Sequence, residues 1–354
     1  MQKYKEIQEI LLAELKAGKY PVGSRFPSEY ELGYRFEVSR LTANKAVNLL
    51  VADGWLERGV RGSGARVKQT QKFPKGMILY IGGLVQSTPS LSLDGLYSQA
   101  FQRGYYVTVG SPVDTALNSF LATAVASGIF VGIVTADYFW FDDQCPGLPV
   151  IYLGNYYASG NHTARHLVVT DNEKVSHRLV KEIFARGYRS PVIYADYSYQ
   201  LTERIGRVKG MQQAMQEFGV QNWEKRLFIA PNRNNFTKVD AVAQLRKILH
   251  DFPDVDAIIN VSDHLAQRMY EAVQEAGIPT PEKILLTGFG NYEHVSGFHH
   301  LPSVEQHLYQ IGVAGADMLL DIVEGKTSPD ETHLHIVPAE LVNLEYIPQR
   351  GFRS

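Results

Sequence analysis

Residues 40–52 carry the most informative pattern of apolar and polar positions in the chain. Their apolar residues stand at i, i+3, i+4 and i+7, the spacing that places side chains on one face of a helix. These positions are Ala43, Ala46, Val47 and Leu50. Residues 3–17 have a similar stripe, made of Ile7, Ile10, Leu11 and Leu15. Both segments therefore predict helices that bury one face in a small common core.

Capping residues predict where two successive helices begin and end. Ser28 is followed three residues later by Glu31, the spacing of a capping box, so a helix is expected over residues 29–36. Ser39 is a second N-cap, and Asp53-Gly54 is a typical helix end. The sequence thus predicts two helices that are joined by a tight turn.

The polar face of the second helix carries hydrogen-bond donors and no carboxylate. Its members are Arg40, Thr42, Asn44, Lys45 and Asn48. Side chains of this kind bond phosphates or base edges, and a short helix with such a face fits a DNA major groove. The alternative interpretation is an ordinary solvated face of a helix pair.

Two short strands are predicted after this helix pair, over residues 55–58 and 65–67. The segment between them, GVRGSG, contains glycines that permit a tight hairpin tip. Arg58, Arg61 and Arg66 are expected to lie along the resulting ribbon. Helix, helix–turn–helix and a basic two-stranded wing together predict a winged helix.

The net charge differs between residues 1–76, here called the head, and the rest of the chain, here called the body. Residues 1–76 hold 14 Lys and Arg against 8 Asp and Glu, a net charge of +6, whereas the rest of the chain has −8. A basic head on an acidic body predicts that the head meets nucleic acid.

Length and composition predict a two- or three-domain protein of the cytoplasm. The chain has 354 residues, 45% of them hydrophobic, and a single cysteine. No 18-residue apolar run or N-terminal signal core is present, so neither a membrane span nor export is expected. We expect a head over residues 1–68, a linker over 69–76 and a ligand-binding body over 77–354.

From residue 77 the pattern changes to short apolar strands between amphipathic helices. Strands are predicted over residues 77–82, 105–109, 129–134, 150–153, 167–169, 191–195, 226–230, 257–261 and 284–287. Helices are predicted over residues 93–103, 120–127, 174–186, 208–218, 239–250, 265–276 and 311–323. This alternation is typical of parallel sheets with helices on both faces, and so many units need two sheets or one very large one.

The head resembles the GntR family of bacterial transcription regulators. The resemblance covers residues 3–68 and is carried by YPVGSRFPSE (20–29), VSRLT (38–42), DGWL (53–56) and GSG (62–64). It implies DNA contacts by Ser28, Tyr30, Ser39, Arg40, Thr42, Asn44, Lys45, Arg61, Gly62 and Ser63. Tyr30 replaces the family's usual arginine, and Asn44 and Lys45 stand where the family often has arginine. Fewer guanidinium groups predict a less guanine-directed readout.

The body resembles the sugar-binding core of the LacI family, which has the periplasmic-binding-protein fold. The resemblance covers residues 77–347 and is carried by GYYV (104–107), PVI (149–151), TDNE (170–173), RVKGM (207–211), DHLA (263–266), GF (288–289) and GVAGA (312–316). It implies two doubly wound parallel α/β subdomains, joined by three crossovers, with a ligand in the cleft between them.

Ligand-contacting residues are expected beyond the carboxyl ends of strands. The set is Gly83, Tyr138, Asp171, Arg207, Phe236, Ser262, Asp263 and Asn291. Carboxylates and guanidinium groups suit the paired hydroxyls of a polyol, while Phe236 would stack on its C–H face. The family expects an aspartate after Gly288-Phe289, but this chain has Gly290-Asn291. A sugar derivative other than the common sugars is therefore an open possibility.

Several of these residues have a structural alternative that the sequence leaves open. Asp171 could simply cap the helix that follows it. Arg207 could form a surface ion pair with Glu203, and Phe236 could belong to the core. The aromatic run that contains Tyr138 could contact a second subunit instead of a ligand.

These features together predict a ligand-responsive transcription regulator, with operator DNA and a small metabolite as partners. A homodimer is expected because two heads would meet two half-sites. No cofactor, metal or catalytic residue is predicted; the pairs His162/His166 and His333/His335 lack a third ligand. The alternative is a sugar-processing or pyridoxal-phosphate enzyme with a fused DNA-binding head.

Overall fold

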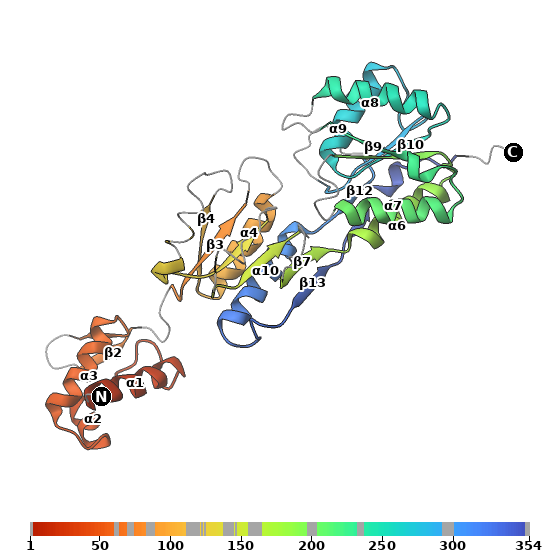
Figure 1. Cartoon of the computed structure of the whole chain (residues 1–354). Helices are drawn as coiled ribbons and strands as arrows, with labels where there is room; N and C mark the ends of the chain where they lie inside the picture. The colour runs from red at the N-terminus through yellow and green to blue at the C-terminus, as the bar shows by residue number, and fades with distance from the viewer. Residues whose placement is uncertain are drawn as a thin grey trace. The chain divides into compact units, whose positions relative to one another are not determined.

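The computed structural model describes most of the chain, in two compact units. The described residues are 3–59, 64–68, 74–82, 89–110, 121–136 without 122 and 124, 145–154 without 146, 165–196, 204–231, 237–291 and 301–350. The units are Met1–Gly76, which is the head, and Met77–Ser354, which is the body (Figure 1).

In its described residues, the head has three helices and a two-stranded antiparallel sheet. Its elements are α1 (Lys3–Lys16), α2 (Glu29–Arg35), α3 (Arg40–Ala52), β1 (Leu56–Arg58) and β2 (Ala65–Val67). Helices α1 and α2 both pack on α3, and β1 follows it directly. The predicted winged-helix order is therefore observed in the described residues.

The apolar stripes build the core of the head, with one exception. All four apolar positions of α3 are buried, together with Leu11 and Leu15 of α1. Ile10, which the pattern placed inward, is 45% exposed. The stripe of α1 is narrower than predicted, because this small core accepts one side chain per turn from that helix.

The body begins with a six-stranded sheet in the order β13-β7-β6-β5-β3-β4, whose pairs are all parallel. Its strands are β3 (Met77–Ile81), β4 (Tyr106–Gly110), β5 (Phe130–Thr135), β6 (Val150–Leu153), β7 (His166–Thr170) and β13 (His333–Val337). One face is covered by α4 (Pro89–Gln102) and α10 (Leu308–Val323). Leu121 and Cys145 join the apolar cluster on the opposite face.

Helices α4 and α10 approach each other backbone to backbone. A Cβ placed on Gly312 would lie 1.9 Å from the carbonyl oxygen of Ser92. A Cβ on Gly95 would lie 2.0 Å from that of Tyr309. Glycine is required at both positions because any side chain would separate the two helices.

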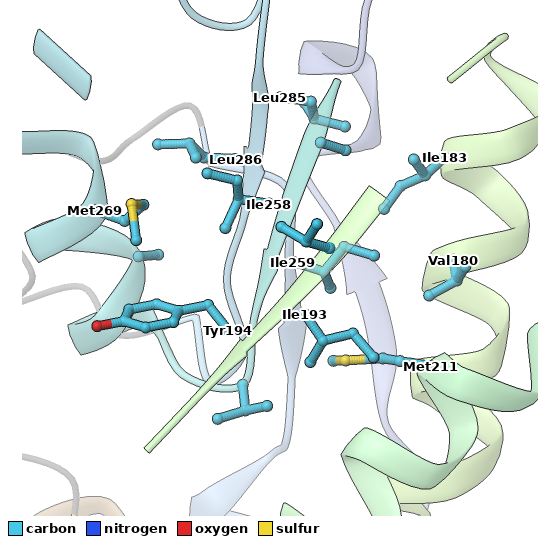
Figure 2. Close-up of a cluster of buried hydrophobic side chains, with 14 of the residues drawn as sticks. Val180, Ile183, Ile193, Tyr194, Met211, Ile258, Ile259, Met269, Leu285 and Leu286 are labelled. Atoms are coloured by element: carbon cyan, nitrogen blue, oxygen red, sulfur yellow. The ribbon is translucent and has the colours of Figure 1, made fainter. Parts of the chain in front are cut away.

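The second sheet is four-stranded and parallel, in the order β11-β10-β8-β9. Its strands are β8 (Pro191–Ala195), β9 (Leu227–Ile229), β10 (Ala257–Asn260) and β11 (Leu285–Thr287). Its helices are α6 (Asn172–Ala185), α7 (Arg204–Glu217), α8 (Lys238–Asp251) and α9 (Asp263–Glu275), with 3-10 turns η3 (Trp223–Arg226) and η4 (Leu344–Tyr346). Figure 2 shows Ile193 directed toward Met211 of α7, and Tyr194 toward Met269 of α9. Strands β8, β10 and β11 are thus buried on both faces, as their continuous apolar runs predict, whereas the edge strand β9 leaves Ile229 41% exposed.

Three crossings join the two sheets. The chain passes from β7 into α6, from β11 through β12 (Ser303–Glu305) into α10, and from β13 into β14 (Glu340–Val342). Strands β12 and β14 pair antiparallel and belong to neither large sheet. The prediction of two doubly wound parallel sheets is confirmed, whereas β12, β13 and β14 were not predicted. No described helix is both long and apolar enough to cross a membrane.

Candidate functional site

Helices α2 and α3 begin at the predicted caps. The Oγ of Ser28 accepts from the Glu31 amide at 3.3 Å, and the Glu31 carboxylate accepts from the Ser28 amide at 2.7 Å. The Oγ of Ser39 accepts from the Thr42 amide at 3.2 Å and also lies 2.9 Å from the Thr42 hydroxyl. Since these oxygens already bond the helix ends, Ser28 first of all caps α2 and Ser39 caps α3.

The outer surface of α3 is cationic near its amino end. Arg40 and Lys45 are exposed, whereas Thr42 and Asn44 are half-buried. The Arg40 guanidinium lies over the Tyr30 ring, 4.6 Å from its centroid, and Tyr30 itself is 70% exposed. Tyr30, which stands where the resemblance implies an arginine, therefore holds the Arg40 guanidinium by a cation–π contact.

Arg58 ends strand β1 of the ribbon, as the sequence predicted, but its side chain reaches the side of α3. Its guanidinium donates to the Glu29 carboxylate at 2.6 Å, and to the Oδ1 atoms of Asn44 at 2.9 Å and Asn48 at 2.6 Å. Burial raises the pKa of Glu29, but the hydrogen bond from Arg58, a backbone hydrogen bond and the charges of Arg58 and Arg40 together lower it below its usual value. The polar face of α3 has no carboxylate of its own, as predicted, but Glu29 of α2 stands beside it.

The wing is described only at its base. Leu56 to Arg58 pair with Val67 to Ala65, and the Gly59 amide donates to the Gly64 carbonyl at 3.0 Å. The predicted contact residues Arg61, Gly62 and Ser63 lie outside the described residues.

Both sheets of the body contain a point where the strand order reverses. In the first, β4 and β5 lie on opposite sides of β3, so the reversal falls between β3 and β5. In the second, it falls between β8 and β10. Such switch points hold ligands beyond the carboxyl ends of their strands. Gly83 follows β3 and Tyr138 follows β5, but both lie outside the described residues, as does Phe236.

Ser262 and Asp263 come directly after β10, at the switch point of the second sheet. The Ser262 side chain caps α9 by accepting from the Leu265 amide. Asp263 is buried, and its Oδ1 accepts from the Ser303 hydroxyl at 2.8 Å. A Cβ on Gly288 would lie 2.0 Å from that same Oδ1, so glycine leaves room for the carboxylate.

Arg207 is 2% exposed, so its interpretation as a surface ion pair is wrong. Its Nε donates to the Oδ1 of Asn172 at 3.0 Å and its Nη1 to the Val261 carbonyl at 2.7 Å. The guanidinium lies over the Phe289 ring, 3.9 Å from the centroid. Arg207 thus joins α7, α6 and the ends of β10 and β11.

Asp171 caps α6, as the structural alternative predicted. Its Oδ1 accepts from the Lys174 amide at 3.4 Å and its Oδ2 pairs with the Lys174 ammonium at 3.2 Å. The side chain is still 29% exposed. The capping role therefore leaves its carboxylate accessible.

Asn291 has a φ of 52° and donates through Nδ2 to the Glu305 carboxylate at 2.8 Å. Glu305 lies on β12, and it pairs with Gly290, the position where the resemblance implies an aspartate. Glu305 therefore supplies, from β12, a carboxylate beside the position where the sequence motif lacks one. Glu305 was not predicted because β12 was not predicted. Asn172 and Phe289 belong to the motifs TDNE and GF, but neither was assigned a role, because their contact with Arg207 joins separate elements.

Comparisons with known proteins identify both parts of the chain. Residues 3–67 match the model of bacterial regulatory proteins of the gntR family. Residues 180–343 match that of a periplasmic binding protein-like domain. The chain is 21% identical to the arabinose metabolism transcriptional repressor of Geobacillus stearothermophilus, over 92% of this chain and 93% of that protein.

Two solved structures show the same fold. The transcriptional regulator CelR–cellobiose complex has a TM-score of 0.64 at 19% identity and covers 86% of this chain and 90% of its own. The lac repressor dimer bound to operator and the anti-inducer ONPF has a TM-score of 0.62 at 17% identity, over 77% of this chain and 93% of its own. At these identities the likeness establishes fold and nothing finer.

Proposed function

We propose, on the premise that this chain joins a GntR-type helix–turn–helix domain to a periplasmic-binding-protein-like domain, that it is a transcription regulator controlled by a small metabolite. Its full-length relatives are transcriptional repressors of arabinose metabolism. Because the proposed target is chromosomal DNA, we expect the protein to act in the cytoplasm.

One observation carries the proposal for DNA binding. Helix α3 buries its apolar face completely and leaves Arg40 and Lys45 on the outside of a basic head. Cationic side chains at the start of a short helix can reach phosphates and base edges in the major groove. We infer contacts from Ser28, Tyr30, Ser39, Arg40, Thr42, Asn44 and Lys45, with Arg61, Gly62 and Ser63 added from the wing.

The effector would bind at the switch points of the body. Asp171 and Asn291 would meet its hydroxyl groups, while Ser262, Asp263 and the buried Arg207 would shape and position the site. Gly83, Tyr138 and Phe236 would complete it. A sugar or sugar derivative fits this set, since carboxylates and amides bond adjacent hydroxyls in pairs. CelR was solved with cellobiose, which supports a carbohydrate.

We further propose a homodimer, because paired heads match pseudo-palindromic operators. An exposed aromatic patch on α4 and the edge strand β4 is a suitable contact: Tyr97 is 48% and Phe101 49% exposed, and their rings stack 6.4 Å apart. Tyr106 of β4 extends the patch at 38% exposure. Aromatic residues are enriched in the centres of such interfaces.

Light scattering of the full chain tests the dimer. Phe101→Glu should yield monomers, because an unpaired carboxylate would be buried in the contact. Leu334→Glu is the control, since Leu334 is 60% exposed on the opposite edge strand β13. Dissociation by Leu334→Glu alone would transfer the interface to β13.

We expect the effector to release the protein from its operator. A ligand that closes the body would change the placement of the two heads in the dimer, which couples two sites through one conformational equilibrium. Operator duplex should first be selected from a randomised library and then titrated by gel shift. A sugar that raises the melting temperature should also weaken the shift. Absence of any salt-sensitive duplex binding would disprove the regulator itself.

A further inference from the structure

Arg58 is held by three acceptors that come from two helices. Its Nη1 donates to Glu29 of α2, and its Nη2 donates to the Oδ1 atoms of both Asn44 and Asn48 of α3. The donor–acceptor distances run from 2.6 to 2.9 Å, and the Arg58 side chain is 39% exposed. A guanidinium with this many partners has one defined position on the side of α3.

This contact fixes the orientation of both amides. A guanidinium has donors and no acceptor, so each asparagine must turn its oxygen toward Arg58. The Nδ2 of each amide then points away from the guanidinium. Neither Nδ2 has a hydrogen bond within the described residues, and Asn48 is exposed while Asn44 is half-buried. Helix α3 therefore presents two amide donors, one turn apart.

The bases offer different edges to such donors. Guanine presents two acceptors, N7 and O6, whereas an asparagine reads adenine by using its oxygen and its nitrogen together. Here the oxygen is engaged by Arg58. An adenine amino group that approached the same oxygen would meet the N–H groups of the guanidinium, which repel it.

We propose that Arg58 sets the base preference of α3 by holding Asn44 and Asn48 as donors, so that they select guanine over adenine. This inference rests on the proposed DNA binding. It also revises the expectation from sequence that a helix with fewer arginines reads guanine less.

Selection from a randomised duplex library with the full chain tests the proposal. Asn44→Ala first identifies the base pair that Asn44 reads, because the preference there disappears. The natural chain should select guanine at that pair. Arg58→Met frees the amide oxygen and should move the preference to adenine, by roughly tenfold in relative binding constant.

Arg66→Met is the matched control. Arg66 lies on the neighbouring strand β2 and donates to the Gly23 carbonyl, and it has no hydrogen bond to α3 among the described residues. Its loss should weaken binding to all sequences alike. A uniform loss in Arg58→Met as well, with guanine retained, would overturn the proposal and make Arg58 a brace or a phosphate contact.

Asn44→Asp keeps the bond to Arg58 and removes the outward donor. It should therefore replace guanine by cytosine, whose amino group needs an acceptor. If Arg58→Met unfolds the head, Asn44→Asp still tests the proposal. Unchanged guanine selection by Asn44→Asp would disprove it. Failure of the natural chain to bind any duplex would be a failure of the proposed function instead.

Discussion

Arginines organise both candidate sites, but in opposite surroundings. Arg58 of the head is 39% exposed in its side chain and bonds partners that lie within thirty residues of it. Arg207 of the body is 2% exposed and bonds Asn172 and Val261, which lie 35 and 54 residues away. The head thus carries its chemistry on a surface, whereas the body builds its site into its own core. Changes in the head should alter recognition, and changes in the body should first alter stability.

The largest expected effect comes from Gly210, where α7 touches α6. A Cβ there would lie 2.0 Å from the Glu173 carbonyl oxygen. Gly210→Ala should destabilise the body by about 3 kcal/mol through overpacking, as measured by urea denaturation. Gly206, four residues earlier on the same helix, is the control: its Cβ would lie 3.5 Å from the nearest atom. Gly206→Ala should be neutral or stabilising, so equal losses in both variants would reject the packing argument.

Arg207→Met should cost about 2 kcal/mol of body stability, because Asn172 and Val261 each lose a donor in a buried place. Duplex affinity of the head should remain unchanged when no effector is present. Arg207→Lys should recover only part of the loss, since an ammonium cannot stack on Phe289 and bond both acceptors as the guanidinium does. If Arg207→Met were as stable as the natural chain, the buried contacts of Arg207 would contribute nothing to the free energy of unfolding.

Arg40→Ala should weaken binding to a selected duplex by roughly tenfold without shifting the melting temperature. Arg40 is exposed and contacts the face of Tyr30, so its loss leaves no buried partner unpaired. Lys181→Ala removes the same charge from an exposed position of α6 and should leave gel-shift affinity unchanged. Equal weakening by both would point to net charge and away from a specific contact.

The smallest effect expected is that of Glu14→Gln on the head. Hydrogen bonds from Arg35 chiefly lower the pKa of Glu14 from 4.5 to about 2, against the effect of burial. Since the folded pKa is depressed, the stabilisation is present above pH 4.5 and is lost as pH falls through 2. The variant should lose about 1 kcal/mol near neutral pH. Its melting temperature should approach that of the natural chain in acid, and a difference independent of pH would contradict this role.

Much of the head could be predicted from short-range patterns. The caps at Ser28 and Ser39, the buried stripe of α3 and the wing strands all depend on residues close in sequence. The partners of Arg58 could not be predicted, because an arginine on a strand beside a basic loop is equally consistent with a phosphate contact. Its actual partners depend on how α2, α3 and β1 pack together.

The body divides in the same way. Apolar runs were sufficient to predict nine of the ten strands in its two parallel sheets. Strand β13 was not predicted, because three of its five residues are exposed at a sheet edge. The partners of Asp263 and Asn291 were not predicted either. They are Ser303 and Glu305 of β12, a short strand between the two sheets whose sequence has no strong apolar pattern.

By itself, the sequence determined most of the order of helices and strands, the division of charge between head and body, and the motif positions. These follow from spacing and residue type within a few turns of chain. Only the tertiary structure decided that Arg58 turns the amides of α3 outward, that Arg207 is buried against Phe289, and that Glu305 stands beside Gly290. Each of these contacts joins separate elements, and no local pattern encodes which side chains meet once those elements pack.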